Sequence, residues 1–206
     1  MECYRTISHV ASDEFTIKKS RFIGHIRPVT SADEAVQFIN EVKSKHWDAT
    51  HNVYAYVLRD GHIMRYSDDG EPQGTAGIPV LDVLQKENLS DCAVVVTRYF
   101  GGIMLGAGGL VRAYSHGAKI AVDVGETVIM CQCFVCSIKV DYSFYGKLPN
   151  IILAFGGIIE NTTFSDAVQV TFRLPQDKSE ALMKEIVEQS GGRYTFEVAS
   201  EVFAPV

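Results

Sequence analysis

A glycine-rich segment between two arginines holds the residues with the clearest potential for chemistry. It runs from Arg98 to Arg112 and contains five glycines between an apolar stretch and a helical pattern. Glycine lets the backbone adopt positive φ and approach a ligand closely. A helix that starts after such a loop presents free N–H groups and a positive dipole end to an anion, and arginine adds paired donors that match phosphate or carboxylate. We therefore predict a contact with an anion or an RNA backbone, made by Arg98, Gly101, Gly102, Gly106, Gly108, Gly109 and Arg112.

This segment departs from two known phosphate-binding motifs. Gly101 and Gly106 have the spacing of a P-loop, but Ala107 stands where that motif needs lysine. Gly106 and Gly108 begin a dinucleotide fingerprint, but Val111 occupies the position of its third glycine. A purely structural explanation is also open, in which the glycines only allow a tight crossover from a strand to a helix.

A second glycine-rich segment, SDDGEPQGTAGIP from Ser67 onward, carries three carboxylates in four positions. Asp68, Asp69 and Glu71 are candidate oxygen ligands for a hard cation, although they lack the spacing of an EF-hand. The same residues are also ordinary turn formers. We expect Thr75 to be a helix N-cap, which would make Gly74 and Thr75 part of a second helix start that faces an anion.

The run KKSR places further cations near the N-terminus. Lys19 and Arg21 would join the predicted anion contact if the fold brings them beside Arg98 and Arg112. Otherwise such a run is a solvated strand edge.

Composition and charge restrict the class of protein. The chain has 206 residues, of which 47% are hydrophobic and 21% charged, as in ordinary globular proteins. Its net charge is −6, whereas a protein that wraps duplex DNA is basic, so any nucleic-acid contact must use a local patch. No apolar run is long enough to span a membrane. The odd number of cysteines, five, predicts reduced thiols and a cytoplasmic location.

The order of predicted elements indicates two α+β domains. In residues 1–132 we expect strands at 6–10, 14–18 and 21–29, a helix from Ser31 to about His46, a hairpin of strands 51–59 and 62–66, a helix ending near Glu87, a buried strand at 92–100 and a helix at about 109–122. In residues 133–206 we expect strand 137–142, helix 146–155, strands 157–162 and 167–174, helix 178–189 and strand 193–202. That βαββαβ order is typical of ferredoxin-like domains.

Four strings of the sequence together resemble the IMPACT/YigZ family. They are KKSRFIGHI, ATHNVYAY, YSDDGEPQGTAGIPVL and VVVTRYFGGIMLGAGGLVRAY, and the resemblance covers essentially the whole chain. It implies an N-terminal IMPACT domain with a ribosomal protein S-five domain-two-like fold. It also implies a C-terminal ferredoxin-like domain similar to domain five of elongation factor G.

The resemblance further implies a link to translation, because both related folds occur in translation proteins that touch RNA. The eukaryotic member regulates translation by competing for an activator of the general-control kinase. This sequence lacks the extra N-terminal domain of those proteins, so we do not expect that partner here. The resemblance implies no catalytic residues and no cofactor.

Two functions remain open. The first is a regulatory protein that binds RNA or the translation machinery through the arginine- and glycine-rich face. The second is an enzyme on a small phosphorylated or nucleotide ligand, with Asp68, Asp69 or Glu71 holding a metal. We favour binding, because no complete catalytic constellation is present. A protein partner is also possible, and we expect no membrane contact.

Overall fold

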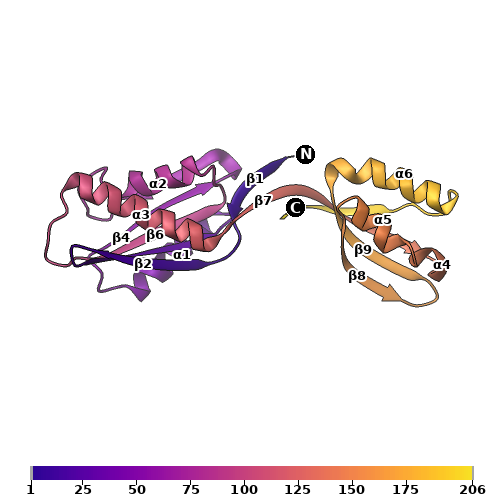
Figure 1. The fold of residues 1–206 in the computed structure, drawn as a ribbon, viewed down its shortest axis with the longest axis horizontal. Coiled ribbons are helices and arrows are strands. Elements are labelled where there is room, and N and C mark those ends of the chain that lie inside the picture. The colour runs from indigo at the N-terminus through magenta and orange to yellow at the C-terminus, as the bar shows by residue number, and fades with distance from the viewer. Residues whose placement is uncertain (1, 206) are drawn as a thin grey trace. The chain divides into compact units, whose positions relative to one another are not determined.

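The computed structural model describes residues 2–205, which form a mixed α+β protein of two compact units. One unit runs from Arg5 to Val128, and the other combines the described residues up to Tyr4 with those from Ile129 onward (Figure 1). The α+β class expected from the sequence is confirmed. A separate domain at residues 133–206 stays a proposal. No helix in the described chain is both long and apolar enough to cross a bilayer.

A five-stranded antiparallel sheet forms the centre of the first unit. Its order is β2-β3-β6-β4-β5. The strands are β2 (Ala11–Ile17), β3 (Ser20–Pro28), β6 (Cys92–Tyr99), β4 (His51–Leu58) and β5 (Ile63–Ser67). The apolar run predicted as a buried strand is β6, the middle of the sheet, and its residues from Cys92 to Arg98 are all buried. A 3-10 turn at Asp60–His62 closes the predicted hairpin between β4 and β5.

Helices cover both faces of this sheet, which explains why β6 is apolar on both sides. The helices are α1 (Ala32–Lys45), α2 (Gly77–Lys86) and α3 (Ala107–Gly125). Ala93 and Val95 pack into the cluster built with α1, whereas Val94 and Val96 pack into the cluster built with α2 and α3. Figure 1 shows α2 and α3 over the same side of the sheet.

The first helix begins where the sequence predicts. Ser31 caps it by accepting the N–H of Glu34 at 3.2 Å. The Glu34 carboxylate reaches back to the N–H of Thr30 at 2.7 Å, one residue before the position that a standard capping box uses. The helix buries a stripe formed by Ala35, Phe38, Ile39 and Val42.

Two glycines fix the depth of α3 against the sheet. A Cβ on Gly24 of β3 would collide with the backbone carbonyl oxygen of Gly117 in α3. A Cβ on Gly117 would lie 2.7 Å from Cγ1 of Val96 in β6. The helix therefore packs backbone against backbone, and this contact determines where its N-terminus lies at the end of the sheet.

The second unit has the ferredoxin-like order that the sequence predicts. Its elements are β7 (Thr127–Val140), α4 (Tyr142–Tyr145), α5 (Leu148–Ala154), β8 (Ile158–Phe164), β9 (Val168–Pro175), a 3-10 turn (Gln176–Lys178), α6 (Ser179–Ser190) and β10 (Glu197–Pro205). Strand β9 lies between β7 and β8, and β10 pairs with β7, so the first and third strands of the unit are neighbours. The helix expected at 146–155 is two short helices, because the first turn starts earlier, at a cap made by Asp141.

The N-terminal strand corrects the prediction about cysteines. Strand β1 (Cys3–Ile7) is a neighbour of β7, and this pairing joins Cys3 to Cys131 in a disulfide across 128 residues of sequence. The expectation that all five thiols are reduced is therefore wrong for these two. Cys92, Cys133 and Cys136 are free and buried. Burial raises the pKa of the Cys92 thiol to about 12 and that of Cys136 to about 11, so these thiols are unreactive.

We expect thiol titration to detect the disulfide directly. The denatured chain without reductant should yield the three free thiols, and the reduced chain should yield all five. Cys131→Ser should give four thiols in both conditions, because it releases Cys3. Five thiols in the unreduced wild-type chain would contradict the pairing.

Candidate functional site

Both glycine-rich segments lie at one end of the N-terminal sheet. Strand β6 ends there at Tyr99, and the backbone N–H of Phe100 donates to Oγ1 of Thr50 at 3.0 Å. The next N–H, from Gly101, donates to Oγ of Ser20 at 3.1 Å. These bonds fasten the loop after β6 to the residue before β4 and to the first residue of β3. The sheet end thus has a defined backbone on which a site can be built.

A buried ion pair lies beneath this loop. Nη1 of Arg98 donates to Oε1 of Glu71 at 2.6 Å, and the two residues are only 5% and 8% exposed. Oη of Tyr114, from α3, donates to the same oxygen at 2.7 Å. Burial, and next the negative charge of Glu71, raise the pKa of Tyr114. The guanidinium also lies over the rings of Phe22 and Phe100, at 5.5 Å and 5.3 Å. Arg98 therefore holds three segments together and does not supply the free cation that the sequence suggested.

The start of α2 is occupied by a carboxylate from the chain itself. Asp68 accepts the N–H groups of Gly74, Ala76 and Gly77 at 2.9, 3.1 and 2.8 Å. Thr75 does not cap the helix as predicted; its hydroxyl donates to the carbonyl of Pro72 at 2.7 Å. A charged carboxylate that reaches three donors outcompetes a hydroxyl that reaches one. Gly74 and Thr75 thus lie at a helix start that is already neutralised.

The other carboxylates of this segment also hold protein groups. Asp69 accepts the N–H of Asn52 at 2.6 Å and pairs with Nζ of Lys43 at 2.7 Å. Glu71 is the buried partner of Arg98. Within residues 2–205, no three side chains of His, Cys, Asp or Glu are arranged to hold a metal ion. The three acidic candidates do not converge on one cation.

The start of α3 is open by contrast. Its N-cap is Gly106, no side chain caps the helix, and the first turn contains no acidic residue. Gly102 and Gly106 have φ of 83° and 71°, which a residue with a Cβ rarely adopts. Gly101 is glycine for another reason, because a Cβ there would collide with the backbone of Lys19. Gly108 and Gly109 lie in the first turn, whose N–H groups are available to a ligand.

The close approach of Gly101 to Lys19 brings cations beside this open helix start. Lys18 and Lys19 form the turn between β2 and β3, with φ of 45° and 65°. Both are exposed, as is Arg112 on α3. None of the three pairs with a carboxylate of the described chain. Arg21 differs, because it pairs with Glu14 at 2.5 Å. Of the predicted cations, Lys19 and Arg112 are therefore available to a ligand, whereas Arg21 is paired with Glu14. Lys18, which the sequence analysis did not name as a site residue, is also available.

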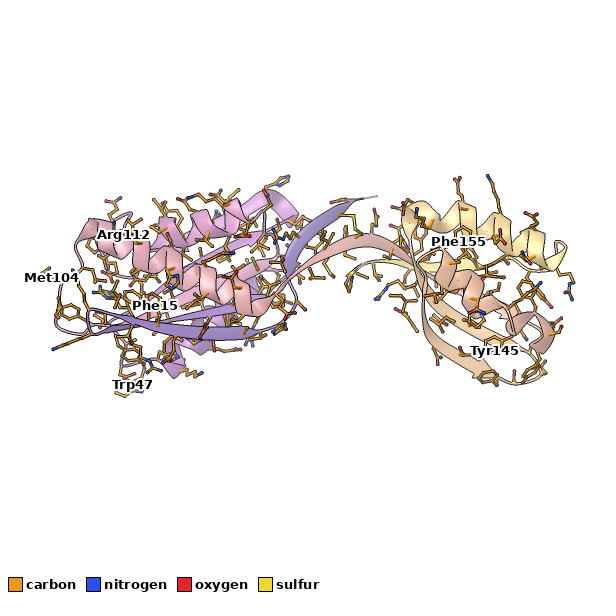
Figure 2. The ribbon with its side chains drawn as sticks, viewed as in Figure 1. Phe15, Trp47, Met104, Arg112, Tyr145 and Phe155 are labelled. Atoms are coloured by element: carbon orange, nitrogen blue, oxygen red, sulfur yellow. A yellow bond between two sulfur atoms is a disulfide. The ribbon has the colours of Figure 1, made fainter. Side chains whose placement is uncertain are left out.

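Exposed apolar side chains lie among these cations, and the sequence analysis did not single them out. Met104 is 84% exposed, Phe100 47% and Ile103 42%. Figure 2 shows Met104 and Arg112 at the same end of the N-terminal unit. The sequence does carry a signal for them, namely an apolar string inside a glycine-rich loop, since solvated loops are normally polar. Exposed apolar groups that gather in one place mark interaction surfaces.

A cavity of about 350 Å³ opens at this surface. Its walls are mainly apolar, and the buried ion pair forms its polar part. The lining residues are Glu71, Pro72, Arg98, Phe100, Met104, Leu105, Gly106, Ala107 and Leu110. The cavity joins the second glycine-rich segment to the first, because Glu71 and Pro72 come from one and Gly106 and Ala107 from the other.

A histidine pair lies on the opposite, α1 side of the same sheet. The rings of His25 and His46 are 5.0 Å apart, and Nδ1 of His46 contacts the hydroxyl of Tyr99 at 2.9 Å. Burial, and next the charges of His46 and Lys45, lower the pKa of His25 to about 4. Burial likewise lowers the pKa of His46, and both side chains are buried.

The fold and the site define a two-domain α+β protein with a ferredoxin-like second domain and a ligand-sized cavity beneath an uncapped helix start. The family model described as the Impact N-terminal domain matches residues 18–122, and the one described as Domain of unknown function (DUF1949) matches residues 138–193. The chain belongs to the IMPACT family. Every candidate site residue from Lys18 to Arg112 lies inside the first match.

Similar proteins occur in bacteria and eukaryotes. IMPACT family member YvyE of Bacillus subtilis is 37% identical over 194 residues, which is 94% of this chain and 89% of that protein. IMPACT family member YigZ of Escherichia coli is 32% identical, over 85% of this chain and 88% of its own. The Protein IMPACT homolog of Dictyostelium discoideum is 40% identical over 53% of this chain and 31% of its own. A solved structure titled "Crystal structure of an hypothetical protein" has a TM-score of 0.62 and 30% identity, and covers 97% of this chain and 98% of that one.

We expect the buried ion pair to be necessary for stability. Glu71→Gln should lower the free energy of unfolding by about 3–5 kcal/mol, because it leaves Arg98 buried without its partner. Tyr114→Phe, the milder control, removes one hydrogen bond to the carboxylate and should cost about 1.5–3 kcal/mol. Both values come from urea unfolding of the purified chain. If Glu71→Gln lowers the free energy of unfolding by less than about 1 kcal/mol, the pair does not have this role.

We also expect the histidine pair to make stability depend on pH. In the unfolded chain His25 takes up a proton near its ordinary pKa of 6.5, whereas in the folded chain it does so only near pH 4. The unfolded state therefore binds more protons between these values, and the free energy of unfolding should fall by up to about 3 kcal/mol as the pH drops from 6.5 to 4. His25→Gln should flatten this part of the profile. Parallel profiles for the two proteins would exclude His25 as the source.

Proposed function

We propose that this IMPACT-family protein is a regulatory binding protein that contacts single-stranded RNA of the translation machinery. The contact surface is the end of the N-terminal sheet, formed by Lys18, Lys19, Phe100, Met104 and Arg112, and we call it the sheet-end surface. The observation that carries the proposal is the gathering of exposed cations without partners around exposed apolar side chains in an acidic chain.

The chemistry of this surface suits an unpaired nucleic-acid strand. Proteins that bind single strands combine cations that follow the phosphates with aromatic side chains on which bases stack. Lys18, Lys19 and Arg112 supply the charge, and Phe100 supplies an exposed ring. The open start of α3 adds N–H donors for a phosphate. The net charge of −6 limits the number of such contacts, so binding should be moderate in strength.

The alternative, an enzyme on a phosphorylated ligand, has less support. Asp68 is bound to the start of α2, Asp69 to Asn52 and Lys43, and Glu71 to Arg98. A metal-assisted reaction would have to release at least one of these carboxylates from its partner. The resemblance of both domains to folds found in translation proteins also favours binding, as an argument by analogy.

We expect the cations of the sheet-end surface to set the affinity for RNA. Lys18→Asn/Lys19→Asn removes two charges while keeping the positive φ, which asparagine tolerates. This variant should bind a single-stranded oligoribonucleotide at least about fivefold more weakly at low salt. The slope of log K against log salt should fall by about 0.7 for each lost phosphate contact. Fluorescence anisotropy across a salt series measures both quantities.

The matched control is Lys86→Gln/Lys184→Gln, which changes the net charge equally at exposed positions in α2 and α6. It should bind like wild type apart from a small general loss. Equal weakening by both double variants would mean that net charge, rather than this surface, governs binding. Binding that is insensitive to salt would overturn the proposal and leave a protein partner as the leading alternative.

A further inference from the structure

The cavity beneath the sheet-end surface has walls suited to a flat apolar ring. Phe100, Met104, Leu105 and Leu110 line it together with Pro72, and Phe100 and Met104 extend from the wall into solvent. Its volume of about 350 Å³ lies at the lower end of the range for small-molecule sites. An occupant of this shape would stack on Phe100 and lose its contact with water.

The polar part of the cavity offers one donor group beside one acceptor. Oε1 of Glu71 accepts the bonds from Arg98 and Tyr114, and Oε2 accepts none from a described residue. In Arg98 only Nη1 is used; Nε is buried without a partner and Nη2 donates to no described residue. A buried polar atom without a partner, such as Nε of Arg98, is uncommon in proteins, whereas Oε2 of Glu71 and Nη2 of Arg98 are not fully buried. Because both residues line the cavity, the pair can meet a further polar group there.

The charges in the cavity select against a bare anion. A free phosphate or carboxylate would be attracted by Arg98 but repelled by Glu71, whose Oε1 lies 2.6 Å from Nη1 of Arg98. A neutral group with an N–H donor next to an acceptor can satisfy both side chains. The edge of every nucleobase presents such a pair, on a ring that also stacks on aromatic side chains.

The position of α3 completes the arrangement. Gly106 and Ala107 line the same cavity, so the uncapped first turn of α3 lies at its rim. The guanidinium of Arg112 is close to this turn, since its Nη1 would be 3.8 Å from a Cβ on Gly108. A base inside the cavity would therefore have its phosphate beside helix N–H groups and a free cation.

We propose that this cavity is a nucleobase pocket, in which the ring stacks on Phe100, its polar edge meets Glu71 and Arg98, and its phosphate meets the start of α3. The base comes from a single RNA strand or from a free nucleotide. The RNA source rests on the proposed function, and the free-nucleotide source does not.

Ala107→Trp is the variant that tests the pocket. Ala107 is exposed at the first position of α3 and lines the cavity, so a large side chain there should fill the cavity while both residues of the buried pair are kept. Val124→Trp is the control, because Val124 is exposed near the other end of the same helix and does not line the cavity. Urea unfolding of both variants should match wild type and so exclude a loss of folding.

The first arm measures binding of oligouridylate and of an abasic strand with the same number of phosphates. Wild type and Val124→Trp should bind the strand with bases about tenfold more tightly, as expected for a stacked base. Ala107→Trp should bind both strands equally and keep the salt dependence of wild type. If wild type binds both strands equally and in a salt-dependent way, the cavity does not bind a base of an RNA strand. The proposed function would still stand.

The second arm measures binding of AMP, UMP, CMP and GMP by calorimetry. If no strand binds but a nucleotide binds wild type and not Ala107→Trp, the proposed function fails and the nucleobase pocket stands. If Ala107→Trp changes neither the binding of strands with bases nor the binding of nucleotides, the proposal of a nucleobase pocket is overturned.

Discussion

The N-terminal domain depends on one buried ion pair, Glu71 with Arg98. Charges in a low-dielectric interior are tolerated only when they are paired and hydrogen-bonded, and this pair recruits Tyr114 of α3 and the rings of Phe22 and Phe100. It therefore joins the acidic loop before α2, the central strand β6 and the helix α3. These are the three segments that form the candidate site. The Glu71 carboxylate ties them together, and the contact between Gly24 and Gly117 sets the depth of α3 against the sheet.

The charged side chains of the N-terminal domain fall into two groups, those bound to other groups of the domain and those left exposed. Arg98, Arg21, Asp68 and Asp69 are bound to groups of the same domain. Lys18, Lys19 and Arg112 are exposed and have no carboxylate partner in residues 2–205. A chain with a net charge of −6 can thus present a local cationic surface, because Lys18, Lys19 and Arg112 are exposed at one end of the domain without a carboxylate partner.

The two glycine-rich helix starts show how similar sequences acquire different roles. At α2 the carboxylate of Asp68 neutralises the first N–H groups, so that end stabilises the fold. At α3 the cap is Gly106 and no acidic side chain lies in the first turn, so that end stays open beside a cavity. Glycine at 101 and 117 serves packing, whereas glycine at 102 and 106 serves positive φ.

The sequence by itself determined the elements that local patterns control. The apolar run of β6, the cap at Ser31, the Asp60-Gly61 turn and the βαββαβ order are all properties of neighbouring residues, and the structure has each of them. The tertiary structure decided which charges are free, because a partner such as Glu71 for Arg98 lies 27 residues away and is found only when the sheet forms. It likewise decided the disulfide between Cys3 and Cys131, which needs β1 beside β7. Spacing in the chain identifies groups that can do chemistry, and burial and long-range pairing determine which of them remain available.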